Sequence, residues 1–99
     1  MKLLKAKTSH PKKQIFRISD LNFNHYYEKN NSKLVNGAED ILNGAEMIHP
    51  IHVHKCTNEG TYGALGMRYK KGLLKVLKGS QRVTTAKKLG YTHIEGIYV

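Results

Sequence analysis

The stretch GSQRVTTAKKLGYTHIEGIYV, residues 79–99, decides the fold that this sequence predicts. It reads as a glycine turn, a short basic helix over residues 80–89, a stop at Gly90 and an apolar strand over residues 92–99. A turn that opens a helix presents backbone N–H groups and the positive end of the helix dipole, which favour an anion. Arg82 would lie in the first helical turn and add positive charge. The sequence therefore predicts an anion site at residues 79–82.

The rest of the chain has the hydrophobic patterning of a small α+β domain. Apolar residues recur at spacings of three and four over residues 33–47, which is typical of one buried helical face, and Gly37 and Gly44 leave a break in this helix open. Residues 51–55 alternate between apolar and polar side chains as a strand does, and further strands are predicted at residues 15–18, 67–69 and 73–77. The last two would form a hairpin through the turn Lys70-Lys71-Gly72. The expected architecture is a small mixed β-sheet packed with two or more helices.

Length and charge narrow the classes of function. The 99 residues fit one domain, and 17 Lys and Arg against 7 Asp and Glu give a formal charge of +10. Such a balance favours a polyanionic partner, with nucleic acid first and an acidic membrane or protein surface second, and a generally basic protein as the alternative. Lysine outnumbers arginine and acts as a point charge on phosphate. We therefore expect non-specific binding to a nucleic-acid backbone, DNA before RNA.

Cysteine content and hydropathy bear on the cellular location. The single cysteine, Cys56, allows no internal disulfide and no cysteine-rich zinc site. No apolar run approaches the roughly 18 residues of a membrane-spanning helix, and the opening MKLLK lacks the hydrophobic core of a signal peptide. These features predict a cytoplasmic protein without a membrane partner.

Residues 1–14 are expected to form a basic arm that precedes a domain of residues 15–99. The segment carries five lysines and no acid, and few apolar residues beyond Leu3 and Leu4. This composition is typical of a terminal segment that is at least partly mobile.

Three motifs in the chain resemble those of the ParB/sulfiredoxin superfamily, in the same order. Ile18-Ser-Asp-Leu21 is similar to its opening I-x-D-L, and Pro50-Ile51-His-Val53 is similar to its P-I-x-V strand. Residues 77–94, LKGSQRVTTAKKLGYTHI, are similar to its D-G-x-x-R-x-x-A-x-x-x-L-G-x-x-x-I signature, one residue short between the alanine and the Leu-Gly pair. The resemblance covers about residues 15–99 and implies a single-domain ParB/sulfiredoxin-like fold.

The same resemblance implies a phosphate ligand at the G-S-Q-R turn. In relatives this turn holds the triphosphate of ATP or CTP, or lies beside DNA phosphate, so ATP or CTP with Mg²⁺ is a candidate cofactor. By position, the phosphate- or nucleotide-binding residues would be Gly79, Ser80, Gln81, Arg82, Thr84 and Thr85.

Departures from the superfamily pattern limit the chemistry to be expected. Ser80 and Gln81 stand where sulfiredoxin has a cysteine and a histidine, and no neighbouring base in the sequence would activate the serine. Sulfiredoxin activity is therefore not expected. Lys78 replaces the acid that usually precedes the glycine, which removes a candidate metal ligand or catalytic base and adds a cation.

Three histidines are weak candidates for metal ligands. His52 and His54 would share one strand face about 7 Å apart. A third ligand would have to come from His49, His25, Glu46 or Glu59. Without a carboxylate at a tight spacing this pattern is a weak indication of a metal site. We expect no metal site, and histidines that add positive charge at mildly acidic pH instead.

A basic stretch surrounds the predicted phosphate site. No acid occurs between Glu59 and Glu95, and Tyr62 and Tyr69 would offer stacking faces to unpaired bases. We expect a polynucleotide path here in preference to a pocket for a free nucleotide. The predicted nucleic-acid-binding residues are Arg68, Lys70, Lys71, Lys75, Lys78, Arg82, Lys87 and Lys88.

Two hypotheses of function follow from these features. The first is a non-enzymatic module that binds DNA or RNA backbone, and the second is an enzyme of the same fold: a ParB-like nuclease, or an ATP- or CTP-dependent phosphotransferase or hydrolase. The enzyme would need a carboxylate near the phosphate, and the candidates are Asp20, Glu46 and Glu59. The abundance of lysine and asparagine indicates an A+T-rich genome, and the resemblance implies a phage or a mobile element.

Overall fold

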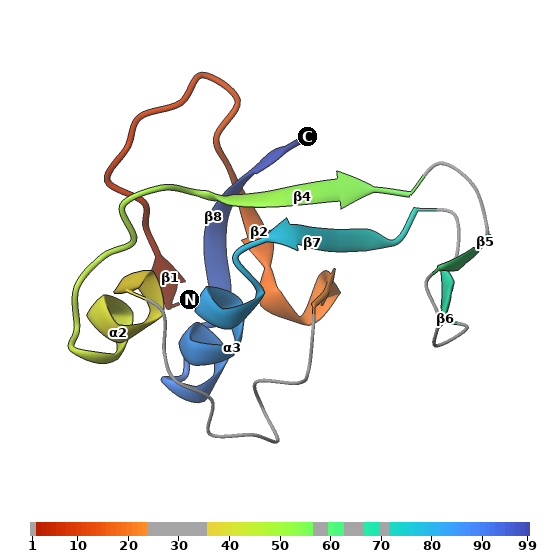
Figure 1. Ribbon diagram of the computed structural model, residues 1–99. Helices are drawn as coiled ribbons and strands as arrows, with labels where there is room; N and C mark the ends of the chain where they lie inside the picture. Colours follow the sequence, from red (N-terminus) through yellow and green to blue (C-terminus); the bar gives the residue numbers. More distant parts are fainter. Residues whose placement is uncertain (1, 24–35, 57–59, 63–66, 70–71) are drawn as a thin grey trace.

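Among the residues that the structure describes, a mixed six-stranded sheet and two α-helices form the main part of this small α+β domain (Figure 1). The computed structural model describes residues 2–23, 36–56, 60–62, 67–69 and 72–99. The strands of the sheet are β1 (Leu3–Leu4), β2 (Gln14–Arg17), β3 (Leu21–Asn22), β4 (Ile51–Lys55), β7 (Leu74–Lys78) and β8 (His93–Tyr98). The helices are α2 (Asn36–Leu42) and α3 (Ser80–Lys88), and a short 3₁₀ helix, η1, covers Ile18–Asp20.

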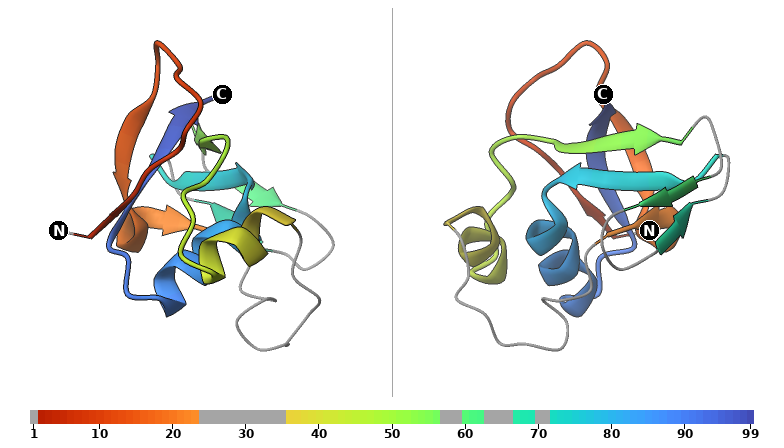
Figure 2. Two further views of the ribbon diagram at one scale, coloured as in Figure 1. Left: turned by 90° about the vertical axis from the view of Figure 1, so that its left-hand side faces the viewer. Right: turned by 45° about the vertical axis from the view of Figure 1, so that its right-hand side comes forward.

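The sheet has the order β1-β8-β4-β7-β3, and β2 also pairs with β8. Strand β8 runs parallel to β1 and β4 and antiparallel to β2, while β7 runs antiparallel to β4 and parallel to β3. Helices α2 and α3 lie side by side at the end of the sheet where β4 begins and β7 ends (Figures 1 and 2). The N-terminus of α3 is therefore next to the start of β4.

The core lies between the helices and one face of the sheet. Ile51 and Val53 of β4 are fully buried, as the alternating pattern predicts, and His52 and His54 project from the other face. Val83 and Ala86 of α3 have no exposed surface and Leu89 packs against the core, so these apolar residues at spacings of three form the inward face of that helix.

The predicted helix over residues 33–47 is shorter in the structure. Helix α2 ends at Leu42, and Gly44 follows with a φ of 89°. A left-handed glycine is a common helix stop, so the break that Gly44 left open does occur. Residues 33–35 of the predicted helix lie outside the described residues.

The predicted hairpin between residues 67–69 and 73–77 is wrong. Strand β6 (Met67–Tyr69) pairs with β5 (Gly60–Tyr62) in a separate two-stranded sheet, and β7 pairs with β4 and β3. The physical reason is burial: Val76 pairs with Val53 and is 5% exposed, so pairing with β4 gives β7 a place in the core. Local turn chemistry at residues 70–72 carries no information about that partner.

The expected basic arm is part of the domain. Strand β1 pairs with β8, and Leu4 is 1% exposed within the core. Further along, the N–H groups of Lys7 and Thr8 donate to the carbonyls of Met47 and Ile48, each at 2.8 Å. Four of its five lysines are exposed, whereas Leu4 and the backbone contact residues 40 or more positions away in the chain, which composition does not reveal.

No helix in the described part of the chain is long and apolar enough to cross a membrane.

Candidate functional site

The turn between β7 and α3 can be made only by glycine without strain. Gly79 has φ 107° and ψ 17°, a left-handed conformation that residues with a Cβ rarely adopt. A Cβ at this position would lie 2.7 Å from Cγ2 of Ile51 and 2.8 Å from Nη2 of Arg82. The backbone thus enters α3 in direct contact with the start of β4 and with the guanidinium of Arg82.

Arg82 lies across this turn in a fixed orientation. Its Nη1 donates a hydrogen bond to the backbone carbonyl of His49 and lies 3.8 Å from Sδ of Met47. Burial lowers the pKa of Arg82 from its ordinary value, but a guanidinium stays charged at neutral pH. The residue therefore places a half-buried positive charge at the first turn of α3.

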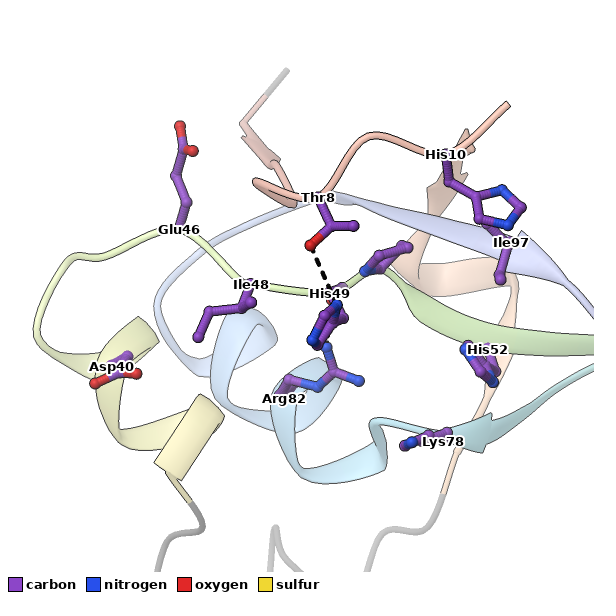
Figure 3. Close-up of a pocket in the computed structure, with 11 residues that line it drawn as sticks. Thr8, His10, Asp40, Glu46, Ile48, His49, His52, Lys78, Arg82 and Ile97 are labelled. Atoms are coloured by element: carbon purple, nitrogen blue, oxygen red, sulfur yellow. Dashed lines mark hydrogen bonds between the residues drawn. The ribbon is translucent and has the colours of Figure 1, made fainter. Parts of the chain in front are cut away.

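A pocket of about 470 Å³ opens at this position (Figure 3). The segment of residues 8–10, the loop that precedes β4, β4 itself and the first turn of α3 contribute to its walls. The pocket is lined by Thr8, His10, Asp40, Glu46, Ile48, His49, Pro50, His52, Lys78, Arg82 and Ile97. Its lining thus combines two permanent cations, three histidines and two carboxylates.

Positive charges converge on His52 within this pocket. Partial burial lowers the pKa of His52 below its usual value, and the charges of Lys78, Arg82 and His10 lower it further. His52 is consequently neutral at pH 7. The arrangement concentrates cations that repel one another, and a bound anion would relieve this repulsion.

His49, His52 and His54, the candidate metal ligands, are not grouped around one point in the structure. His49 Nδ1 lies 3.1 Å from the hydroxyl of Thr8, whereas His54 Nδ1 donates to the backbone carbonyl of Val99 at 3.1 Å. Within the described ranges, no group of three or more His, Cys, Asp or Glu side chains could hold a metal ion.

The structure separates the residues predicted to contact phosphate. Arg82 lines the pocket and Gly79 lies beneath its guanidinium. Thr84 and Thr85 are buried, and their hydroxyls donate to the carbonyls of Ser80 and Gln81, each at 2.9 Å. The expected hydroxyl contacts from these threonines are therefore wrong.

The orientation of α3 explains this outcome. All residues from Val83 to Ala86 are buried, because α3 packs against α2 on one side and belongs with Ile51 and Ile94 of the sheet to one core cluster on the other. Gln81 is also buried, at 6% exposed, and Ser80 is half-buried and does not line the pocket. Of the four turn residues, Arg82 is the one whose side chain reaches the pocket.

The residues of the predicted basic surface lie in two separate places, in β7 and at the C-terminal end of α3. Lys75 and Lys78 belong to β7, on the side of the pocket, whereas Lys87 and Lys88 lie in the last turn of α3. The ammonium of Lys87 lies 5.7 Å from the centre of the Phe23 ring. The side chain of Arg68 in β6, together with Lys70 and Lys71, lies outside the described residues.

Several residues that line the pocket are not predicted from the sequence. Thr8 and His10 come from the segment expected to be a mobile arm, and Asp40 comes from α2. Each is at least 30 residues from Arg82 along the chain, and nothing in their local sequence points to that neighbour.

The fold and site together define a small α+β domain with a cationic pocket at a strand-to-helix turn. Comparison with known proteins gave no match: no family model, no curated protein and no solved structure is significantly similar to the chain.

Proposed function

We propose that this protein is a phosphate-binding module of ParB/sulfiredoxin-like fold that binds nucleic-acid backbone. The observation that carries the proposal is the convergence of Lys78, Arg82 and His52 in one pocket beside the N-terminus of α3. Lysine and arginine in a partly buried site make charge-assisted hydrogen bonds to phosphate oxygens, and the helix N-terminus adds its partial positive charge.

The meeting of two sequence motifs supports the superfamily assignment. Ile51 of the P-I-x-V motif lies against Gly79 of the G-S-Q-R turn, and Arg82 of that turn binds the carbonyl of His49, next to the same motif. Two short patterns almost 30 residues apart thus form one wall of the pocket. A shared site is a reason for both motifs to occur in one chain.

The net charge supports a polyanion as the partner. The chain carries a formal charge of +10, and an excess of this size attracts nucleic acid over distances comparable to the screening length. ATP and CTP offer the same phosphate chemistry and are the free ligands that the pocket would accept.

We expect phosphate binding to raise the pKa of His52. In the free protein the pKa lies below 6.5, because of burial and of the charges of Lys78, Arg82 and His10. A phosphate between these groups offsets their charge and raises the pKa of His52. At pH values between the His52 pKa of the free protein and that of the complex, binding is accompanied by the uptake of a proton. Affinity should therefore rise as pH falls through and below about 6.5.

Histidine-ring NMR titrations with and without inorganic phosphate, ATP, CTP and a short DNA single strand measure this effect. His54, which binds the Val99 carbonyl and does not line the pocket, serves as the internal control for phosphate, ATP and CTP. An unchanged His52 pKa at saturating concentrations of every ligand would exclude the pocket as the phosphate site.

An enzyme of the same fold is the second candidate function, because two carboxylates line the pocket. Asp40 and Glu46 are both exposed there, and carboxylates near a phosphate are what Mg²⁺-assisted transfer or hydrolysis requires. The Glu46 carboxylate points away from Arg82 in Figure 3, which favours the binding module. Asp20 lies in η1 and does not line the pocket, and Glu59 lies outside the described residues.

A comparison of amide variants separates the two functions. If the protein is a binding module, Glu46→Gln and Asp40→Asn should bind DNA equally or slightly more tightly, since negative charge near the backbone is lost. Glu39→Gln, in α2 and outside the pocket, is the matched control. Mg²⁺-dependent cleavage of DNA or hydrolysis of ATP by the parent protein, lost in Glu46→Gln or Asp40→Asn and kept in Glu39→Gln, would establish the enzyme instead.

A further inference from the structure

Two cross-strand pairs carry histidine and lysine on one face of the sheet. In the ladder between β4 and β7, His52 lies opposite Lys78 and His54 lies opposite Lys75. Val53 and Val76, which pair between them, are buried toward the helices. Because side chains alternate along a strand, the two histidine–lysine pairs project from the opposite face, which we call the outer face.

A β-bulge is what puts both lysines on the outer face. Lys75 and Lys78 are three positions apart, so regular alternation would direct them to opposite faces of β7. The register shifts between His52 and Val53, which leaves Leu77 as an extra residue and brings Lys78 opposite His52. Leu77 is 52% exposed as a result.

The pairs lead in a line to the pocket. His54 and Lys75 come first, and His52 and Lys78 follow about 7 Å further along the strands. The latter two line the pocket together with Arg82. This step is close to the separation of successive phosphates in an extended polynucleotide. The two lysines give this face positive charge, which attracts a polyanion.

We infer that the outer face of β4 and β7 is the path of a single-stranded polynucleotide, with one phosphate in the pocket at Arg82 and Lys78 and the next at Lys75 and His54. The inference rests on the proposed function. It specifies the class of ligand and the course that the ligand takes from the pocket along β4 and β7. A concave pocket accepts a phosphate of a flexible strand, whereas a duplex presents its phosphates on a stiff convex cylinder. The exposed side chain of Leu77 lies between the two lysines and gives an unstacked base an apolar contact.

A strand on the outer face of β4 and β7 does not contact the C-terminal end of α3. Lys88 is exposed in the last turn of that helix, at the end away from Gly79. The substitutions Lys75→Gln and Lys88→Gln remove the same charge and the same type of side chain, and therefore form a matched pair.

The test measures the affinity of a fluorescently labelled DNA single strand, of the corresponding duplex and of ATP as a function of salt. For the single strand, Lys75→Gln should weaken binding about three- to tenfold at low salt and reduce the slope of log K against log salt by about 0.7, the loss of one phosphate contact. Lys75→Glu should weaken it further, and Lys88→Gln should leave both quantities unchanged. ATP affinity should be the same in Lys75→Gln as in the parent, because its phosphates fill the pocket alone.

Each contrary outcome has a definite meaning. Equal effects of Lys75→Gln and Lys88→Gln, or tighter binding of the duplex than of the single strand, would overturn the path while leaving a phosphate site at Arg82 intact. Loss of ATP and strand binding alike in Lys75→Gln, with an unchanged circular dichroism spectrum, would also overturn it, since the two positions would then form one site. If neither ATP nor the strand alters the His52 pKa, the proposed function itself fails.

Discussion

Replacing Gly79 by alanine is expected to lower the free energy of unfolding by about 3 kcal/mol. Two costs add at this position. The left-handed φ of 107° strains a residue that has a Cβ, and the new methyl group would lie 2.7 Å from Ile51, which is fully buried and cannot move aside. The substitution should also displace Arg82, whose Nη2 lies 2.8 Å from the same point. Urea unfolding of the parent and the variant measures the change.

Gly44 provides the matched control for Gly79. It has a similar left-handed φ of 89°, but apart from its two neighbours in the chain no residue has an atom within 4 Å of the position that a Cβ would take. Gly44→Ala should therefore carry the conformational cost alone, about 1–2 kcal/mol. Equal destabilisation by the two substitutions would show that the close contact of the turn with Ile51 and Arg82 is absent in solution.

Replacing Arg82 by glutamine is expected to weaken binding of ATP and of a DNA single strand by about 10- to 100-fold. The guanidinium is the one permanent cation that lies half-buried in the pocket, so its contact with phosphate is screened less by water than a surface contact is. The affinity of Arg82→Lys should lie between those of the parent and of Arg82→Gln, because lysine keeps the charge but lacks the parallel donors of the guanidinium. Fluorescence anisotropy for the strand and calorimetry for ATP measure these affinities.

Arg17→Gln is the control for the charge itself. Arg17 is exposed in β2 and does not line the pocket, so the same substitution there should change affinity little beyond the loss of one distant charge. Arg82 also binds the His49 carbonyl, and the fold of each variant is checked by urea unfolding at the same pH. Comparable losses of affinity in the two variants would indicate diffuse charge attraction in place of a site.

The local elements near residue 79 could be predicted because their causes are local. Glycine at residue 79, the inward spacing of Val83 and Ala86, and glycine at residue 90 act within a few residues of one another, and α3 occurs where these signals place it. The alternation of β4 is equally local, since Ile51 and Val53 must share a face whatever covers them. The predicted α+β class with a mixed sheet rests on these elements and holds in the structure.

Pairing and pocket could not be predicted, because they depend on which distant segments meet. Composition describes residues 2–14 as a basic segment, but the burial of Leu4 against β8 makes this segment part of the sheet and brings Thr8 and His10 to the pocket. The turn signal at residues 70–72 predicts a hairpin, but the burial of Val76 against Val53 joins β7 to β4 instead.

The sequence by itself determined the glycine turn, the helix that follows it, the alternation of β4 and the excess of positive charge, because each depends on neighbouring residues or on composition. Only the tertiary structure decided where those charges lie and which polar side chains are buried. Packing on two sides of α3 buries Thr84 and Thr85, whose hydroxyls bind carbonyls of the same helix. The bulge at Leu77 places Lys78 on the same face of the sheet as Lys75. Both effects arise from contacts between strands and helices far apart in the chain, where burial of apolar side chains outweighs local preference.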